Sequence, residues 1–285
     1  MQARKLIPRK PLPWEVTEGR IARSVPRWLA WCFLASAAAP MLWGQAASTK
    51  TPAQAPASDA LPTADQILER YVEVTGGQAE YEARTSEITH ATVTFTSVGI
   101  QGELTEYAAD GNYRSSLELP GLGTQTMGVS DGIAWETSDL LGPRIKEGVE
   151  RADAVREAIM NEPIWWRETY QEVSVSGIRD SGGEPCYEVV MVPAEGAAIR
   201  RCYSVESGLA LETATKAMTQ MGELDSVAQM SEYKDFGGIL APSRILENAA
   251  GQQLEILIQS VDVNQDIPDE VFALPEDVAA LVATP

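Results

Sequence analysis

The sequence has few of the side chains from which metal sites and nucleophilic catalytic sites are built. Its 285 residues include one histidine, His90, and three cysteines, none of them in a Cys-x-x-Cys pair. Zinc sites and c-type haem attachment need such ligands at fixed spacing, and both are excluded. A Ser-His-Asp or Cys-His site would have to use His90, which lies in a predicted strand. We therefore expect no enzyme, no metal site and no cofactor; a hydrolase acting through two carboxylates is the enzymatic alternative.

Basic residues are also scarce. The chain has 22 Lys and Arg against 41 Asp and Glu, which gives a net charge of −19 at pH 7. Seven of the basic residues but only two of the acidic ones lie in positions 1–46, so the rest of the chain carries −24. Such a surface repels phosphate backbones and anionic lipid leaflets. We therefore expect no nucleic-acid partner and no peripheral electrostatic binding to membranes.

Long hydrophobic runs are absent after residue 46. Before it, three arginines precede the apolar run 28–43, and a small-x-small pattern ends at Ala46. This pattern predicts a secretory signal peptide over 1–46, with an extended n-region, cleavage near Ala46/Ala47, and no stable membrane insertion of the mature chain. An uncleaved anchor is the alternative, although a run of 16 residues with a proline inside is shorter than the ~20 residues of a spanning helix.

The mature chain is expected to form a single domain over 62–285, because 44% of the residues are apolar and can form a core. Residues 47–61 are rich in Ala, Pro, Ser and Thr, which indicates a flexible leader. Thr63 to Gln66 match a capping box, and Gly76-Gly77 provides a stop. Apolar residues recur between them at helical spacing, which predicts a helix over 63–75.

From Ile88 the apolar period changes from 3.6 to 2, and Asp-Gly pairs at Asp110 and Asp131 predict two hairpins. A helical insert interrupts this pattern over 149–170 and is divided by Pro163. Strands then resume, with predicted ranges 171–179, 185–192, 199–205, 209–217, 223–235, 242–249 and 253–262. The predicted fold is α+β: a large curled antiparallel sheet of about 11 to 12 strands, an unclosed half-barrel, with the N-terminal helix and the insert on its concave face.

Two cysteines remain in the mature chain, and they flank the predicted hairpin turn Pro193 to Gly196. A turn centred on position 194 places Cys186 and Cys202 directly opposite each other. Exported proteins permit disulfides, so a Cys186–Cys202 bond is predicted, with two separate thiols as the alternative.

Apolar side chains of the first hairpins and of the insert are the candidate ligand-binding residues. They are Met127, Trp135, Ile159, Met160, Ile164, Trp165 and Trp166. If the half-barrel is too wide for its own side chains to fill, these residues line an apolar cavity and the insert is its lid. If the sheet is filled, they are ordinary core residues.

Several short motifs follow one another in a distinctive order. They are the helix 61–71 closed by Thr75-Gly76-Gly77, the Asp131-Gly132-x-x-Trp135 hairpin, Tyr203 before Ser207-Gly208-Leu209, the segment 233–242 and the segment 267–275. Together they resemble bacterial secreted proteins of the outer-membrane lipoprotein-sorting type, the LolA/LolB/LppX-like superfamily, over roughly 61–275. The resemblance implies a periplasmic protein with an unclosed antiparallel barrel that holds acyl chains.

Two functions are compatible with these observations. The first is a periplasmic, non-enzymatic binding protein that sequesters acyl chains of a lipid or lipoprotein in an apolar cavity. The alternative is an envelope protein-interaction or stress-sensing module with a fully packed sheet, no lipid ligand and an envelope protein as its partner.

Overall fold

The computed structural model describes residues 61–219, 222–249 and 251–283, which belong to one compact unit, Pro56–Pro285. The predicted signal peptide and residues 47–60 of the predicted leader lie outside the described residues.

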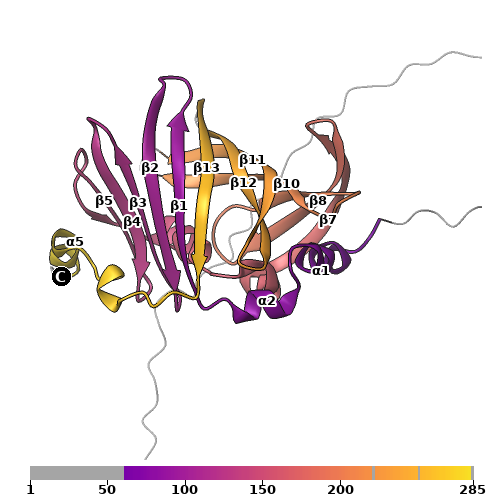
Figure 1. Cartoon of the computed structure of the whole chain (residues 1–285), viewed down its shortest axis with the longest axis horizontal. Helices are drawn as coiled ribbons and strands as arrows, with labels where there is room; N and C mark the ends of the chain where they lie inside the picture. Colours follow the sequence, from indigo (N-terminus) through magenta and orange to yellow (C-terminus); the bar gives the residue numbers. More distant parts are fainter. Residues whose placement is uncertain (1–60, 220–221, 250, 284–285) are drawn as a thin grey trace, which may run out of the picture. The chain divides into compact units, whose positions relative to one another are not determined.

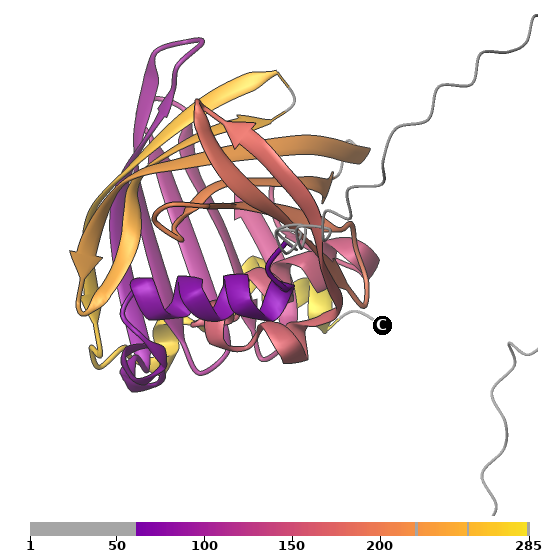
Figure 2. The same cartoon turned by 90° about the vertical axis from the view of Figure 1, so that its right-hand side faces the viewer.

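An antiparallel sheet of 13 strands forms the body of the described chain, in the order β6-β5-β4-β3-β2-β1-β13-β12-β11-β10-β9-β8-β7. The strands are β1 Ser86–Phe95, β2 Ile100–Ala109, β3 Asn112–Leu119, β4 Gly123–Ser130, β5 Ile133–Ser138, β6 Arg144–Ile145, β7 Tyr170–Ser181, β8 Glu184–Pro193, β9 Ile199–Ser204, β10 Ala210–Thr219, β11 Gly222–Phe236, β12 Ile239–Ala249 and β13 Gln252–Val263. The last strand pairs with the first, which joins two meanders into one sheet. The sheet curls and leaves β6 and β7 as unpaired edges, so the predicted half-barrel is confirmed (Figures 1 and 2).

Local turn chemistry fixes the first hairpins. Asp110, Gly111, Asp131 and Gly132 all have positive φ, between 48° and 77°, as two-residue hairpin turns of this kind require. The strands predicted after residue 170 agree with β7 to β13 within a few residues. The short strand β6 was missed, because two residues carry no periodicity.

The first helix, α1 (Ala64–Val74), begins at the predicted capping box. The Gln66 amide donates to Thr63 Oγ1 at 3.3 Å, and the Thr63 amide donates to Gln66 Oε1 at 2.9 Å. Ile67 and Leu68 are buried on its inner side. Two further short helices, α2 (Gln78–Ala83) and α5 (Glu276–Val282), were not predicted, because each is too short to show a clear period.

The predicted insert consists of α3 (Gly148–Glu157), the 3-10 turn η1 (Glu162–Ile164) and α4 (Trp166–Thr169). Pro163 lies in the first turn of η1, where its missing N–H costs no helical hydrogen bond. α3 contacts β4, β5 and β10, whereas α1 contacts β7 and η1.

Two apolar clusters hold the helices against the sheet. The larger joins α1 and α4 to β8, β9 and β10, and it contains Ala64, Ile67, Leu68, Trp166, Tyr170, Val189, Met191, Ile199, Tyr203 and Ala210. The smaller joins α3 to β4 and β5 through Val129, Ala134 and Ala158. The two wings of the sheet are therefore packed by different helices.

The predicted disulfide is present, but its position in the hairpin differs from the expected one. Cys186 pairs with Ser204 across the ladder, and Glu188 pairs with Cys202, so the bonded cysteines are diagonal neighbours rather than direct partners. Their Cα atoms are 5.4 Å apart, a normal separation for a disulfide. The turn is centred one residue later than the sequence suggested, which shifts the register by two.

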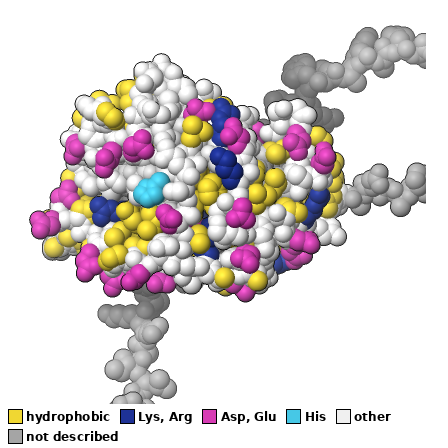
Figure 3. Space-filling view, in the orientation of Figure 1, with side chains coloured by type: hydrophobic (Ala, Val, Ile, Leu, Met, Phe, Trp, Pro, Cys, Tyr) yellow, Lys and Arg dark blue, Asp and Glu magenta, His cyan; other side chains and the backbone are white. Residues whose placement is uncertain are grey.

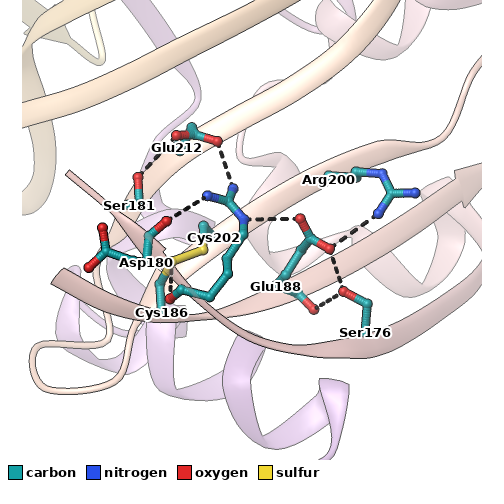
Figure 4. A network of polar contacts seen from close by, with 9 residues as sticks. Ser176, Asp180, Ser181, Cys186, Glu188, Arg200, Cys202 and Glu212 are labelled. Atoms are coloured by element: carbon teal, nitrogen blue, oxygen red, sulfur yellow. Dashed lines mark hydrogen bonds and ion pairs between the residues drawn. A yellow bond between two sulfur atoms is a disulfide. The ribbon is translucent and has the colours of Figure 1, made fainter. Parts of the chain in front are cut away.

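A polar network surrounds this disulfide (Figure 4). Arg179 Nε donates to Glu188 Oε1 at 3.0 Å, and its Nη2 donates to Glu212 Oε1 at 2.7 Å. Ser176 and Arg200 also donate to Glu188, at 2.5 and 3.2 Å. The Ser176 hydroxyl and the two guanidinium groups outweigh the effect of burial and lower the pKa of the Glu188 carboxyl.

Candidate functional site

A cavity with a volume of about 800 Å³ lies between α3 and both wings of the sheet. Gln125, Met127 and Glu136 reach it from β4 and β5, and Ile199 and Thr213 reach it from β9 and β10. These strands are far apart in the sheet order, so they can share a cavity only on the concave face. The structure therefore places α3 beside an internal cavity of the half-barrel.

Apolar side chains form part of this cavity. They are Met127, Leu141, Ala154, Tyr170 and Ile199.

The same concave face carries an apolar row in the middle of the sheet. Ladder pairing links Met127 through β3 and β2 to Thr89, and Thr89 and Val93 lie on the same side of β1 because side chains alternate. Val93 pairs with Ile256, which pairs with Ile245. The two isoleucines are only half-buried, so this part of the concave face is apolar and incompletely covered.

Charged side chains make up much of the remaining lining, with five cations and five carboxylates. The cations are Arg144, Lys146, Arg156, Arg201 and Lys216, and the carboxylates are Glu136, Glu150, Asp153, Glu157 and Glu162.

Most of these charges neutralise one another within the lining. Arg144 donates to Glu136 at 2.6 Å and to Glu150 at 2.7 Å. Arg156 pairs with Asp153 at 2.7 Å, and Arg201 pairs with Glu162 at 2.8 Å. Charge pairs of this kind offset the cost of desolvation, so the wall is charged in composition but close to neutral in sum.

Glu157 is an exception among the carboxylates. It lines the cavity but is an exposed side chain, and it makes no hydrogen bond or ion pair within the described residues.

The sequence candidates are not brought together in the cavity. Met127 lines it, whereas Ile164 and Trp166 line a smaller groove of about 310 Å³ between α1 and the insert. Trp166 is buried beside α1, with the guanidinium of Arg167 4.1 Å from its ring centre. Trp165 is 47% exposed. Ile159 and Met160 are half-buried, and neither is among the residues that line the cavity.

Trp135 lies on the opposite face of the sheet. It pairs with Gly128, next to Met127 on β4, and neighbouring residues of a strand point to opposite faces. Its side chain has no exposed surface, and its indole Nε1 donates to Ser130 Oγ at 3.0 Å. The face on which Trp135 lies could have been predicted from the sequence, because a two-residue turn at Asp131-Gly132 already pairs position 135 with position 128.

Residues 128–132 match a Gly-x-Ser-x-Gly pattern, which in some hydrolases marks a nucleophile. Here the segment is the end of β4 and a hairpin turn, without the strand-to-helix context that exposes such a serine. Ser130 is buried, and its hydroxyl donates to the Phe272 carbonyl at 2.6 Å. His90 is exposed on β1 and contacts Thr105. Ser130 is therefore a structural contact for the C-terminal segment.

Sequence reasoning missed the charged groups of the cavity. Asp153 and Arg156 are three residues apart on α3, a spacing at which side chains meet, but the other pairs join separate elements. In an acidic chain the carboxylates resemble a solvated surface, and Figure 3 indeed shows Asp and Glu spread over one outer face. Only the curl of the sheet brings the cavity set together.

The described residues contain neither a metal-binding cluster nor a membrane-spanning helix. No group of three or more His, Cys, Asp or Glu is arranged to hold a metal ion. Among the same residues, no helix has the length and apolar character needed to cross a membrane.

The comparisons with solved structures identify the fold. A LolA superfamily protein from Nitrosomonas europaea aligns with 75% of this chain and 99% of its own, with 13% identity and a TM-score of 0.50. The fold is LolA-like. A DUF1329 family protein from Desulfovibrio piger aligns over 74% of this chain and 97% of its own, with 12% identity and a TM-score of 0.51. No family model and no curated protein matches the LolA-like chain by sequence.

Proposed function

We propose that this chain is a periplasmic, non-enzymatic binding protein that holds acyl chains of a lipid or lipoprotein inside its half-barrel. The observation that carries the proposal is the 800 Å³ cavity on the concave face, beside the half-covered apolar row of β1, β12 and β13. Its volume falls within the range of about 300–1,000 Å³ that is usual for small-molecule sites. The alternative interaction module required a fully packed sheet, and the open cavity does not favour it.

The energetics are adequate for such a ligand. Each buried methylene contributes about 0.8 kcal/mol, so ten methylenes contribute about 8 kcal/mol before the cost of ordering the chain. A net charge of −24 after residue 46 disfavours electrostatic attachment to anionic membranes, whereas binding inside the half-barrel needs no such contact.

Displacement of a neutral fluorescent probe, N-phenyl-1-naphthylamine, by 1-monopalmitoylglycerol tests the proposal. Thr213 lines the cavity from β10, and Thr213→Trp should place an indole ring inside it and weaken binding at least tenfold. Thr94 is the matched control, because register places it on the opposite face of β1 from Val93. Thr94→Trp should bind like the unsubstituted protein. Absence of binding by the unsubstituted protein, or equal loss in both variants, would overturn the proposal.

A further inference from the structure

Exposed apolar side chains lie at the tips of three hairpins. The turns 96–99, 120–122 and 139–143 join β1 to β2, β3 to β4 and β5 to β6. Alternate turns of an antiparallel meander lie at the same end of the sheet, so these tips are neighbours, at the top left of Figure 1. We call the three turns the hairpin end. The exposed fractions of its apolar side chains are 64% for Val98, 44% for Leu122, 76% for Leu140 and 79% for Leu141.

Charged residues are nearly absent from this part of the chain. Residues 91–102 and 119–130 contain no charged side chain, and residues 137–143 contain a single aspartate. The two turns at the opposite end of the same strands, in contrast, carry Asp110 and Asp131. Since the chain after residue 46 has a net charge of −24, the hairpin end is a local uncharged surface on an acidic protein.

The charges nearest to the hairpin end are engaged with other groups. Asp139 is the one charged residue of the three turns, and its carboxylate accepts a hydrogen bond from the Thr124 amide at 2.9 Å. On the other wing of the sheet, the Lys216 ammonium lies 2.5 Å from the Glu223 carboxylate and 3.9 Å from that of Asp225. The uncharged surface is therefore confined to the wing formed by β1 to β6.

The backbone amides at the tips already have hydrogen-bond partners. The Val98 amide donates to the backbone carbonyl three residues earlier at 3.2 Å, and the Leu122 amide does the same at 3.0 Å. The Leu141 amide donates to the Ser138 hydroxyl at 3.0 Å. An amide without a partner is costly wherever water is excluded, so these turns can leave water at a lower cost than open loops.

The hairpin end also adjoins the cavity of the proposed function. A groove of about 250 Å³ lies between the second and third tips, and its lining includes Leu122 and Leu140. Gln125, Glu136 and Leu141 line both this groove and the 800 Å³ cavity. The groove and the cavity are therefore contiguous, and the apolar tips lie beside the cavity.

A lipid surface matches these observations better than a protein partner. The apolar side chains project from separate turns, whereas protein partners bind large apolar side chains in complementary pockets. A bilayer interface accepts projecting leucines without a matching shape, and the strength of binding scales with the buried apolar area. The net charge of the chain disfavours anionic leaflets, so the matching surface is zwitterionic or uncharged.

We propose that the hairpin end docks on a zwitterionic lipid bilayer, with Leu122 and Leu140 inserted among the head groups. An acyl chain then passes between the bilayer and the cavity beside Leu141, without crossing bulk water. This proposal rests on the proposed function, because it assigns the surface across which the bound acyl chain enters or leaves.

The test is cosedimentation with sucrose-loaded vesicles of dioleoylphosphatidylcholine. The protein is the chain from residue 47, because the apolar run 28–43 would bind vesicles by itself and the compact unit Pro56–Pro285 is retained. We expect binding to these vesicles, and about threefold weaker binding when a third of the lipid is dioleoylphosphatidylglycerol. Leu122→Asn combined with Leu140→Asn should weaken vesicle binding about tenfold. The same variant should keep its affinity for 1-monopalmitoylglycerol in the probe assay within about twofold, because neither side chain lines the 800 Å³ cavity.

The matched control is Leu281→Asn combined with Val282→Asn. These adjacent residues of α5 are 42% and 46% exposed, and α5 lies away from the hairpin end in Figures 1 and 2. This variant should bind vesicles like the unsubstituted protein. A second measurement reports insertion directly: the added fluorescence of Leu140→Trp should be quenched by dibrominated phosphatidylcholine, and that of Leu281→Trp should not.

The outcomes separate this proposal from the proposed function. Failure of the unsubstituted protein to bind zwitterionic vesicles, equal binding by the two double variants, or tighter binding to the anionic vesicles overturns the docking surface, while the probe assay still decides the proposed function. Dimerisation in solution that the Leu122→Asn and Leu140→Asn pair abolishes would assign the hairpin end to a second copy of the chain and would also overturn it. Vesicle binding by a protein from which the monoglyceride displaces no probe would support the docking surface and overturn the proposed function.

Discussion

Reducing the Cys186–Cys202 bond should lower the free energy of unfolding by about 3 kcal/mol. The bond joins cysteines 16 residues apart, and the chain-entropy relation for a loop of this length gives about 3 kcal/mol at 25 °C. Both cysteines have no exposed surface, so a reductant reaches the bond only when the hairpin β8–β9 opens. The folded protein should therefore resist reduction, and the reduced chain should unfold at lower denaturant concentration.

The measurement is equilibrium urea unfolding followed by tryptophan fluorescence, with and without a phosphine reductant. For an m-value of about 3 kcal/mol/M, the midpoint should fall by about 1 M. Cys186→Ala combined with Cys202→Ala is the matched control and should reproduce the shift without reductant. Two free thiols in the denatured, unreduced protein would refute the pairing. A reduced midpoint within about 0.2 M of the oxidised one would refute the loop argument.

Three further changes test the packing and the electrostatics. Trp135→Ala removes a fully buried ring and should cost about 3–5 kcal/mol of unfolding free energy, with the amphiphile affinity of the folded protein unchanged within about twofold. Thr75→Val removes a buried hydroxyl that bonds Tyr81 Oη at 2.8 Å and should cost about 1–3 kcal/mol, measured by urea unfolding. Burial raises the pKa of Glu106, although the Tyr113 hydroxyl opposes this. The folded protein therefore favours the protonated form of Glu106, and this contribution to the free energy of unfolding is complete below the ordinary carboxyl pKa. The contribution is lost as pH rises through the raised pKa of the folded state. Glu106→Gln should therefore gain stability relative to the unsubstituted protein between pH 4 and pH 8.

The controls use positions without such contacts. Thr94→Val should change the unfolding free energy less than Thr75→Val, and Glu172→Gln should show no comparable pH-dependent difference. A Trp135→Ala protein that folds but loses amphiphile binding would show that Trp135 contributes to the site. A stability difference for Glu106→Gln that is the same at pH 4 and pH 8 would contradict the raised pKa.

Features that depend on residues close together in the sequence could be predicted from the sequence alone. The capping box of Thr63 and Gln66 and the Asp-Gly hairpins depend on residues only a few positions apart. The disulfide partners were also correct, but the register was not, because a loop between Pro193 and Ile199 can place its turn at more than one position.

Fold class, strand spacing and export were inferred from the sequence, and the structure bears out the first two. Tertiary structure alone decided which residues form the cavity. Arg201 and Glu162 come from β9 and η1, and Arg144 and Glu136 come from β6 and β5. The curl of the sheet and the docking of α3 bring these groups together. Periodicity assigns a side chain to a face, but the partner across a cavity depends on where distant strands come to lie.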